Sequence, residues 1–360
     1  MCVLKRKGLT YRDAGVDLFK VSESHKIIGK LIEKTFTLRH GKFGEVVGEY
    51  GHYANLIDIG SGRALAVHSD GVGTKVLIAQ LMDKYDTVGI DCVAMNANDL
   101  ICIGAEPLAL VDYLAVEKSD PEMIEKIVQG LVKGAELAGM AILGGETATM
   151  PGVIKGAVEG KGFDLAAMSI GMVYQDKVIT GKEIVANDVV IGLQSSGIHS
   201  NGISLARKAL LDEAGLKVFD PMPNSSQSVG EALLEPTKIY VREILEVLKE
   251  VEVHGLGNIT GGAFSKLKRI CYGKIGMYLD QLLEPPPIFE AIKQAGNIDD
   301  YEMYKTFNMG VGFVVITPKE SSENVISICK KAGTQAQIIG KTTTRQGIKL
   351  EITKGKLLEM

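Results

Sequence analysis

Several features that mark specialised classes of protein are missing from this sequence. Its five cysteines are odd in number, widely spaced and without a CxxC pair, so neither a disulfide framework nor a zinc cluster is indicated. No segment approaches the roughly 20 apolar residues that a membrane-spanning helix needs. The N-terminal MCVLKRKGLTYRD also has no apolar core of the signal-peptide kind. We therefore expect a cytoplasmic protein without a membrane anchor. The cysteines are Cys2, Cys92, Cys102, Cys271 and Cys329.

Charge and short motifs exclude further classes. The net charge of −4 and the pI near 6.0 create no field that would attract nucleic acid, and lysine and arginine form no basic stripe. The sequence contains no GxSxG and no HExxH motif, so a hydrolytic triad or a zinc hydrolase is not supported. The spacing GxxxxGK of a P-loop is also missing from the glycine-rich segment SDGVGTK. We expect no nucleic-acid partner.

The chain is long enough for two domains that intermix helices and strands. It has 360 residues, of which 46% are hydrophobic and 23% are charged, as in globular proteins with a large core. Periodicity and turn residues predict an α/β (α+β) fold with a first domain at 1–172 and a second at 173–360. The predicted strands are 64–70, 108–116, 140–145 and 163–173 (both interpreted as buried), 186–193 and 310–318. The predicted helices are 73–85, 121–139, 201–216, 238–251 and a segment after 285–287.

The segment SDGVGTK at 69–75 follows a predicted strand and precedes a predicted helix. It is a plain turn if Gly71 and Gly73 supply unusual backbone angles and Asp70 caps the helix. Alternatively, the Asp70 carboxylate lies in the ligand crevice at the carboxyl end of the strand, with Lys75 near a phosphate.

Acidic residues recur in the next segment, GIDCVAMNANDL. Asp91 and Asp99 lie about two helical turns apart in an apolar region, where charged side chains must be solvated, paired or bound to cations. Each aspartate alone is explained equally well as a helix cap. All three together, Asp70, Asp91 and Asp99, fit a shared Mg²⁺ site, because Mg²⁺ prefers carboxylate oxygens and nucleotide phosphates.

Three further polar segments are candidates for ligand contacts. LGGETATMPG places Glu146 and Thr147 after two glycines, as a strand-end turn or as the wall of a pocket. QSSGIHSNG at 194–202 precedes a predicted helix, and backbone N–H groups at a helix start bind phosphate well. A solvated loop with a capping residue is equally consistent with that segment, and His199 within it is a phosphate donor, an acid/base group or a structural residue. HGLGNITGGAF at 254–264 holds His254 in a glycine-rich turn, whereas NMGVGF at 308–313 indicates close strand packing.

In order along the chain, these segments resemble the phosphoribosylformylglycinamidine cyclo-ligases, the aminoimidazole ribonucleotide synthetases of purine biosynthesis. The resemblance covers nearly the whole sequence. The matching motifs are YRDAGVD, SDGVGTK, GID, NDL, GAEPL, GGET with MPG, SSGIHSNG, EPTKIYV, HGLGNITGG, IFEAIKQAGNI and EMYKTFNMGVGF. The chain departs from the family at Asn258, where a second histidine is common, and in an N-terminal arm that is poorer in glycine. Lys26 and Lys30 align equally well with a lysine expected near ATP.

The resemblance implies a two-domain fold shared with formylglycinamidine ribonucleotide synthetase, selenophosphate synthetase, thiamine-monophosphate kinase and a hydrogenase maturation protein. It implies a homodimer whose N-terminal domains build a β-barrel-like core. The implied reaction uses ATP and Mg²⁺ to phosphorylate the formamide oxygen of formylglycinamidine ribonucleotide, after which an amidine nitrogen closes the ring and phosphate leaves. Alternatives are a related synthetase, a small-molecule kinase, or a nucleotide-binding module without catalytic activity.

Specific roles follow when the resemblance is carried onto the matching motifs. The resemblance implies catalytic roles for His199, Asp70, Lys75 and Asp99, and Mg²⁺ ligation by Asp70, Asp91 and Asp99. It implies nucleotide binding by Gly71, Gly73, Thr74, Asp91, Asn98, Gly145, Glu146 and Thr147. It implies binding of the ribonucleotide substrate by Ser195, Ser196, Gly197, Ser200, Asn201, Gly202 and His254.

Overall fold

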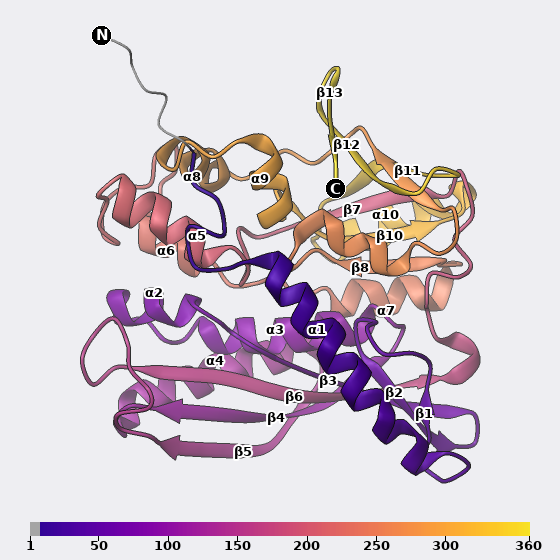
Figure 1. Ribbon diagram of the computed structural model, residues 1–360, viewed down its shortest axis with the longest axis horizontal. Helices are drawn as coiled ribbons and strands as arrows, with labels where there is room; N and C mark the ends of the chain where they lie inside the picture. Colours follow the sequence, from indigo (N-terminus) through magenta and orange to yellow (C-terminus); the bar gives the residue numbers. More distant parts are fainter. Residues whose placement is uncertain (1–7) are drawn as a thin grey trace.

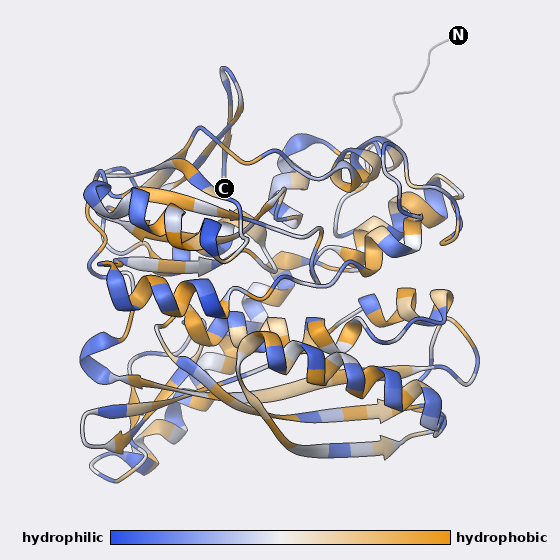
Figure 2. Cartoon of the chain, turned by 180° about the vertical axis from the view of Figure 1, so that it is seen from behind, coloured by the Kyte–Doolittle hydropathy of each residue, from blue (hydrophilic) through white to orange (hydrophobic). Residues whose placement is uncertain are grey.

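The computed structural model describes residues 8–360, so Cys2 and the first seven residues of the N-terminal stretch lie outside the description. The chain forms two β-sheets, one above the other, with helices packed between them (Figure 1). Figure 2 shows apolar and polar segments alternating along these helices, as expected where one side faces a core. The mixed α/β class predicted from the sequence is confirmed.

The first sheet has six strands in the order β1-β2-β3-β6-β4-β5. Its strands are antiparallel except for the parallel pair β4 and β5, which the helix α4 connects. The strands are β1 (Val46–Val47), β2 (Asn55–Gly60), β3 (Arg63–Gly71), β4 (Glu106–Val116), β5 (Ala141–Thr149) and β6 (Phe163–Tyr174). The helices of this half are α1 (Leu18–Ile32), α2 (Lys75–Met82), α3 (Val88–Ile101) and α4 (Pro121–Ala138), with 3-10 segments Glu33–Arg39 and Gln175–Lys177.

The second sheet has seven strands in the order β13-β12-β9-β11-β7-β10-β8. Its strands are β7 (Val189–Gln194), β8 (Gly255–Asn258), β9 (Gly276–Leu279), β10 (Val311–Thr317), β11 (Ala336–Thr343), β12 (Gly347–Thr353) and β13 (Lys356–Glu359). The helices are α5 (Ile203–Arg207), α6 (Val229–Leu234), α7 (Val241–Glu250), α8 (Pro287–Ala295), α9 (Asp300–Thr306) and α10 (Ser322–Lys331). A π-helical segment spans Lys208–Glu213, and 3-10 segments span Ala263–Ile270 (η4) and Lys319–Ser321.

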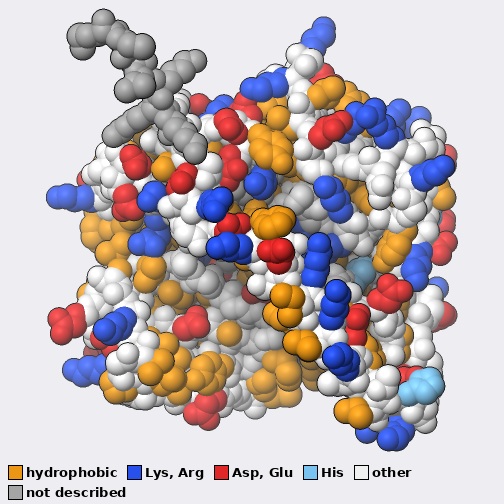
Figure 3. Space-filling model, viewed as in Figure 1, with side chains coloured by type: hydrophobic (Ala, Val, Ile, Leu, Met, Phe, Trp, Pro, Cys, Tyr) orange, Lys and Arg blue, Asp and Glu red, His pale blue; other side chains and the backbone are white. Residues whose placement is uncertain are grey.

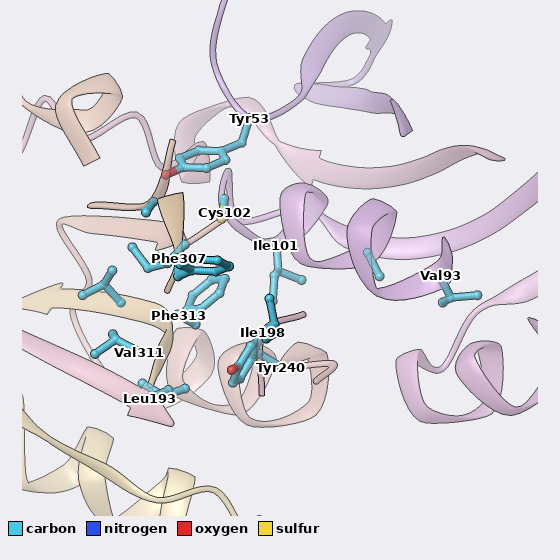
Figure 4. Packing of buried hydrophobic residues seen from close by; sticks show 14 of the residues in the cluster. Tyr53, Val93, Ile101, Cys102, Leu193, Ile198, Tyr240, Phe307, Val311 and Phe313 are labelled. Carbon is cyan, nitrogen blue, oxygen red and sulfur yellow. The ribbon is translucent and has the colours of Figure 1, made fainter. Parts of the chain in front are cut away.

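Helix α3 joins the two halves of the molecule. Every residue of α3 except Ile90 is buried, because the helix packs on the first sheet, on α4 and on α7. Gly89 permits the close approach to α4, since a Cβ at this position would lie 2.2 Å from the Leu131 backbone nitrogen. At its C-terminal end, Ile101 belongs to the same apolar cluster as Phe313 of β10 (Figure 4). The apolar core is therefore continuous between the sheets.

Two details differ from the sequence-based interpretation. The strand predicted to be buried at 140–145 is the exposed edge strand β5, in which Leu143 is 68% exposed. An apolar run does not distinguish a central strand from an edge strand. Asp70 also does not cap α2, because the N-cap is Thr74 and the Asp70 carboxylate accepts a hydrogen bond from Gly71 N instead. In contrast, α4 begins at Pro121, as predicted, and ends at Ala138, one residue before the predicted end.

The first sheet is open, with β1 and β5 at its edges, so residues 8–360 of the single chain form no closed barrel. The described cysteines are all free. In the part of the chain that the structure describes, no helix combines the length and apolar character needed to cross a membrane.

Candidate functional site

Asp99, in the last turn of α3, lies where the two halves of the molecule meet. Its Oδ1 accepts a hydrogen bond of 2.7 Å from Asn258 Nδ2 of the second half. Its Oδ2 lies 3.4 Å from Lys266 Nζ and 3.6 Å from His68 Nε2. The Asp99 carboxylate is therefore surrounded by an amide, an ammonium group and an imidazole from three different segments.

The Lys266 side chain lies between Asp99 and an aromatic ring. Its Nζ donates to Thr260 Oγ1 and lies 4.9 Å from the centroid of the Tyr53 ring, while Arg269 Cζ lies 5.8 Å from the same centroid. Arg269 also lines a cavity of about 380 Å³. Its lining includes Tyr50, His52, Ile103, Lys182, Arg269 and Tyr272. Positive charge thus surrounds Asp99, and Arg269 connects this cluster to the cavity.

Asp70 forms a second acidic group close to Asp99. Burial, and next the negative charge of Asp99, raise the pKa of the Asp70 carboxyl group above its ordinary value. The Gly71 N–H, His68 and Lys266 oppose this shift without cancelling it. A bound cation would favour the ionised form of a carboxyl group whose pKa is raised in this way.

The strand register adds Asp112, for which no role was predicted. Asp70 of β3 pairs with Ala167 of β6, Ala167 pairs with Asp112 of β4, and Asp112 pairs with Gly145 of β5. These residues form one row across the sheet. Gly145 leaves space for the aspartate, because a Cβ there would lie 2.3 Å from Asp112 Oδ1. Burial raises the pKa of Asp112.

Glu146 and Thr147, expected to contact nucleotide, continue the edge strand β5 and are both exposed. Glu146 pairs with Tyr113 and Thr147 with Leu114. The structure therefore places these two side chains at the open edge of the sheet.

Asp91 and Lys75 form a buried ion pair instead of facing a ligand. Lys75 Nζ lies 2.9 Å from Asp91 Oδ1, and both side chains are fully buried. The same Oδ1 accepts hydrogen bonds from Thr237 N at 2.7 Å, from Thr237 Oγ1 at 2.5 Å and from Ser200 Oγ at 3.2 Å. Lys75 also donates to the Glu235 backbone carbonyl. Asp91 thus fastens the first half of the chain to residues near 200 and 237.

This arrangement differs from the three-carboxylate magnesium site that the sequence led us to expect. Asp70 and Asp99 lie close together, but Asp91 is committed to Lys75 and to the second half of the chain. Among the described residues, no group of three or more His, Cys, Asp or Glu side chains has an arrangement that would hold a metal ion. Sequence spacing could not show this, because Thr237 lies 146 positions from Asp91.

Asn98 and Thr74 also connect the two halves. Asn98 Oδ1 accepts a hydrogen bond from Tyr240 N at 3.0 Å, and its Nδ2 donates to the Lys238 carbonyl at 2.8 Å. Thr74 Oγ1 lies 3.0 Å from Ser204 Oγ at the start of α5. Both residues were expected to bind nucleotide, and the structure gives them contacts between the halves.

The loop 195–202 is held by hydrogen bonds from its own side chains and from Asn308. Ser195 Oγ donates to Asn308 Oδ1 at 2.9 Å, and Asn308 Nδ2 donates to the Gly197 carbonyl at 2.9 Å. Ser196 Oγ donates to the Pro236 carbonyl at 2.5 Å. The loop is therefore an ordered element and not a solvated connection.

His199 lies at the centre of this loop and is almost completely buried. Its Nε2 accepts a hydrogen bond from the backbone N–H three residues earlier, and its ring lies beside Tyr240. Gly312 makes room for both rings, because a Cβ there would lie 2.7 Å from His199 Cε1. Burial, followed by the positive charges of Lys75 and Lys238, lowers the pKa of His199 to about 3. The imidazole is therefore neutral near pH 7.

The end of the loop approaches the glycine-rich turn before η4. A Cβ at Gly261 would lie 3.0 Å from Asn201 Oδ1, and Asn201 Nδ2 points toward Met95 Sδ at 4.0 Å. Gly202 has a positive φ of 83° and packs against the Phe307 ring, which a Cβ there would approach to 2.4 Å. Asn201 thus lies between the loop, α3 and the turn that leads to Lys266.

His254 lies away from this loop. It precedes β8, next to Asp188 at the start of β7, whereas the loop follows the end of β7. Its Nδ1 lies 2.8 Å from Asp188 Oδ2, and its Nε2 lies 3.1 Å from Glu252 Oε1. The structure therefore does not bring His254 together with the other residues expected to bind the ribonucleotide.

The AIR synthase related protein N-terminal domain family matches residues 51–173, and the corresponding C-terminal domain family matches residues 185–353. A phosphoribosylformylglycinamidine cyclo-ligase from Methanobrevibacter smithii is 47% identical over 348 residues, covering 96% of this chain and 98% of the relative. The chain belongs to the phosphoribosylformylglycinamidine cyclo-ligase family. A second cyclo-ligase, from Pyrococcus furiosus, is 48% identical over 345 residues and covers 95% and 98% of the two chains. The family predicted from the motifs is confirmed.

The fold is also found in proteins outside the cyclo-ligase family. The crystal structure of hydrogenase maturation protein HypE in complex with ATP superposes with a TM-score of 0.60 at 17% identity, covering 84% of this chain and 85% of that one. At this identity the likeness shows a shared fold alone.

Sequence reasoning on the cyclo-ligase motifs missed several polar residues of the site. His68, Asp112 and Lys266 were given no role, although His68 and Asp112 lie within motif-bearing strands. The sequence did contain one signal: an aspartate within the otherwise apolar strand 108–116 is costly unless it serves a purpose. Lys266 offered no such signal, because lysine is common on exposed helix faces.

Proposed function

We propose that this chain closes the imidazole ring of 5-aminoimidazole ribonucleotide from formylglycinamidine ribonucleotide, with conversion of ATP to ADP and phosphate, in de novo purine biosynthesis. The observation that carries the proposal is the match to curated cyclo-ligases over nearly the whole of both chains. The use of ATP is supported further by the ATP-bound HypE structure of the same fold. As a soluble step of purine biosynthesis, the reaction would take place in the cytoplasm, which cell fractionation tests.

The reaction needs positioning more than it needs a protein nucleophile. The formyl oxygen of the substrate is a poor leaving group until the γ-phosphoryl group is transferred to it. The amidine nitrogen then attacks the activated carbon, and the carbon–oxygen bond breaks with release of phosphate. The rigid connection through Asp91 and Asn98 holds the loop 195–202 in a fixed position relative to Asp70 and Asp99, and such fixed geometry lowers the entropic barrier.

The residues at Asp99 fit a magnesium ion. Mg²⁺ prefers hard oxygen ligands, and this site offers the carboxylates of Asp70 and Asp99. Asn258 Oδ1 adds an amide oxygen that is buried and has no hydrogen-bond partner in the structure. When bound, Mg²⁺ would neutralise charge on the transferring phosphoryl group. We therefore place the metal at Asp70, Asp99 and Asn258 and leave Asp91 out of its coordination.

We place the phosphate of the ribonucleotide at the loop 195–202. This loop has backbone N–H groups and uncharged side chains, which suit a monophosphate that carries no metal ion of its own. Asn201 is the best-placed side chain, because Ser196 and Ser200 are already engaged with Pro236 and Asp91. The neutral imidazole of His199 keeps the loop in shape.

Product stoichiometry tests the proposed reaction directly. Incubation with ATP, Mg²⁺ and formylglycinamidine ribonucleotide should yield ADP and aminoimidazole ribonucleotide in equal amounts, because one phosphoryl group is consumed for each ring closed. The aminoimidazole is measured by diazotisation and ADP by a coupled assay. Formation of ADP without the aminoimidazole on authentic substrate would overturn the ligase assignment in favour of a kinase. Nucleotide binding without any turnover would indicate a non-catalytic module.

We also propose that a second copy of the chain covers the outer face of the first sheet. On β6 the odd-numbered residues from 163 to 173 are buried, whereas Met168 and Tyr174 on the opposite face are 44% and 49% exposed. Tyr113 of β4 lies on the same outer face, opposite Ala166, and is 44% exposed. Figure 3 shows hydrophobic side chains gathered over this part of the molecule. Apolar faces of this kind mark interaction sites, and family members are expected to pair through this sheet.

Light scattering should give twice the chain mass of 38.6 kDa at micromolar concentration. Met168→Asp should weaken the dimer at least tenfold, because it buries an unpaired charge in the interface. Leu357→Asp serves as the control, since Leu357 is 52% exposed on the distant strand β13. A monomeric wild-type protein, or a Met168→Asp variant that stays dimeric, would contradict the placement of the interface.

A further inference from the structure

Lys266 has surroundings that are unusual for a lysine. It lies in η4, where Phe264, Leu267 and Ile270 face the core, and its side chain is only 10% exposed. Burying an ammonium group is costly unless anions or acceptors compensate for the lost water. Lys266 therefore has a role that an ordinary surface lysine does not have.

The contacts of Lys266 leave its charge incompletely paired. The distance of 3.4 Å to Asp99 Oδ2 exceeds the 2.7–2.9 Å that is usual for charge-assisted hydrogen bonds. Thr260 and the Tyr53 ring, its other neighbours, carry no formal charge near pH 7. Among the described residues, Lys266 is the only lysine or arginine that forms an ion pair with Asp99. The ammonium group thus faces an acidic site that we have assigned to Mg²⁺.

From this geometry we propose that Lys266 binds a phosphate group of the nucleotide and so contributes to its site from the second half of the chain. The inference rests on the proposed use of ATP. When a metal–nucleotide complex binds the carboxylate oxygens of Asp99, these oxygens are less available to the ammonium group of Lys266. Asp99 is the only carboxylate that pairs with Lys266 among the described residues. The phosphate oxygens then become the nearest anions. Arg269, whose guanidinium group lies over the same Tyr53 ring, lines a cavity that offers space for the rest of the nucleotide.

The adjacent chemistry favours the nucleotide over the ribonucleotide as the ligand of Lys266. A polyphosphate needs several cations, and Lys266 lies at the carboxylates that we assign to its metal. The ribonucleotide carries one phosphate, for which the uncharged loop 195–202 is sufficient. Lys266 and Asn201 should therefore affect different ligands, although both lie near the same glycine-rich turn.

Calorimetric titration with Mg²⁺ and the non-hydrolysable ATP analogue AMPPCP tests the inference without requiring turnover. Lys266→Gln should raise the dissociation constant of the analogue at least tenfold, about 1.4 kcal/mol, and Lys266→Arg should restore most of the affinity. In Lys266→Gln the KM for the ribonucleotide should change less than about twofold, which corresponds to a much smaller free-energy change. Lys268→Gln is the matched control, because Lys268 lies on η4 and is exposed. Asn201→Ala should show the opposite pattern, with a higher ribonucleotide KM and unchanged affinity for the analogue.

Thermal unfolding without nucleotide separates binding from stability. If Lys266→Gln does not fold, Lys266→Met keeps the aliphatic stem on the Tyr53 ring and removes only the charge. A variant that binds the analogue as tightly as the wild type, whatever its unfolding temperature, overturns the role of Lys266. Failure of the wild type to form aminoimidazole while it still binds the analogue would instead overturn the proposed reaction and leave the binding result valid.

Discussion

Asp91→Asn should lower the free energy of unfolding by about 3–5 kcal/mol, because it leaves the Lys75 ammonium group buried without its counter-charge. Both side chains of the pair are fully buried. Asparagine has nearly the same volume as aspartate, so the loss of stability would come from the missing charge and not from a cavity. Asp91 Oδ1 also accepts hydrogen bonds from Thr237 and Ser200, and these contacts between the halves would weaken together with the ion pair.

Urea unfolding followed by circular dichroism measures this loss. Asp86→Asn is the matched control, because Asp86 pairs with Lys84 at the same 2.9 Å but both side chains are exposed. Exposed pairs contribute about 0–1 kcal/mol. The double variant Asp91→Leu with Lys75→Met should recover part of the stability, because no unpaired charge remains. An Asp91→Asn protein as stable as Asp86→Asn would show that the buried pair is not needed.

Lowering the pH should reduce the free energy of unfolding because of His199. This loss should begin at pH values well above those at which carboxylates titrate. Burial holds the pKa of His199 at about 3 in the folded protein, whereas an unfolded histidine titrates near 6.5. The unfolded chain therefore binds this proton first. The stabilising contribution is fully present above pH 6.5 and is lost progressively as the pH falls toward 3. Between pH 7 and pH 5 the loss should be roughly 2 kcal/mol.

Comparison with His199→Gln isolates this contribution. The variant lacks the titrating group, so the difference in unfolding free energy between wild type and variant should shrink by the same roughly 2 kcal/mol from pH 7 to pH 5. His254→Gln should behave in the opposite way. Burial lowers the pKa of His254, but the hydrogen bonds that its ring donates to Asp188 and Glu252 outweigh burial and raise the pKa. The stabilising contribution of His254 is therefore present below pH 6.5 and is lost as the pH rises through the folded pKa. A difference for His199→Gln that does not change with pH would contradict the buried, neutral imidazole.

Local patterns in the sequence were sufficient to predict most of the elements. The helix Pro121–Ala138 begins at a proline and is followed by Gly139, and both residues act through their own backbone geometry. The strand at 163–173 was predicted from its apolar run, although only one of its two faces is buried. The position of β5 at the sheet edge was not predictable in this way, because strand order depends on pairings between segments far apart in the chain.

The chemistry of the site was harder to predict because its partners are distant in sequence. Asp91 looks like a metal ligand until Thr237 and Lys75 are placed around it. His199 looks like an exposed group in a polar loop until Gly312 and Tyr240 enclose its ring. The motifs identified the family correctly, yet they could not separate residues that face a ligand from residues that hold the halves together.

The burial of α3 bears on how the chain unfolds. A helix with only one partly exposed residue cannot keep its structure once either neighbouring sheet is lost. Asn98 and Asp99 would then expose hydrogen-bonding groups whose partners lie more than 100 residues away. Melting of one sheet therefore removes the support of the other, so the two sheets should share a single cooperative transition although separate domain families match them.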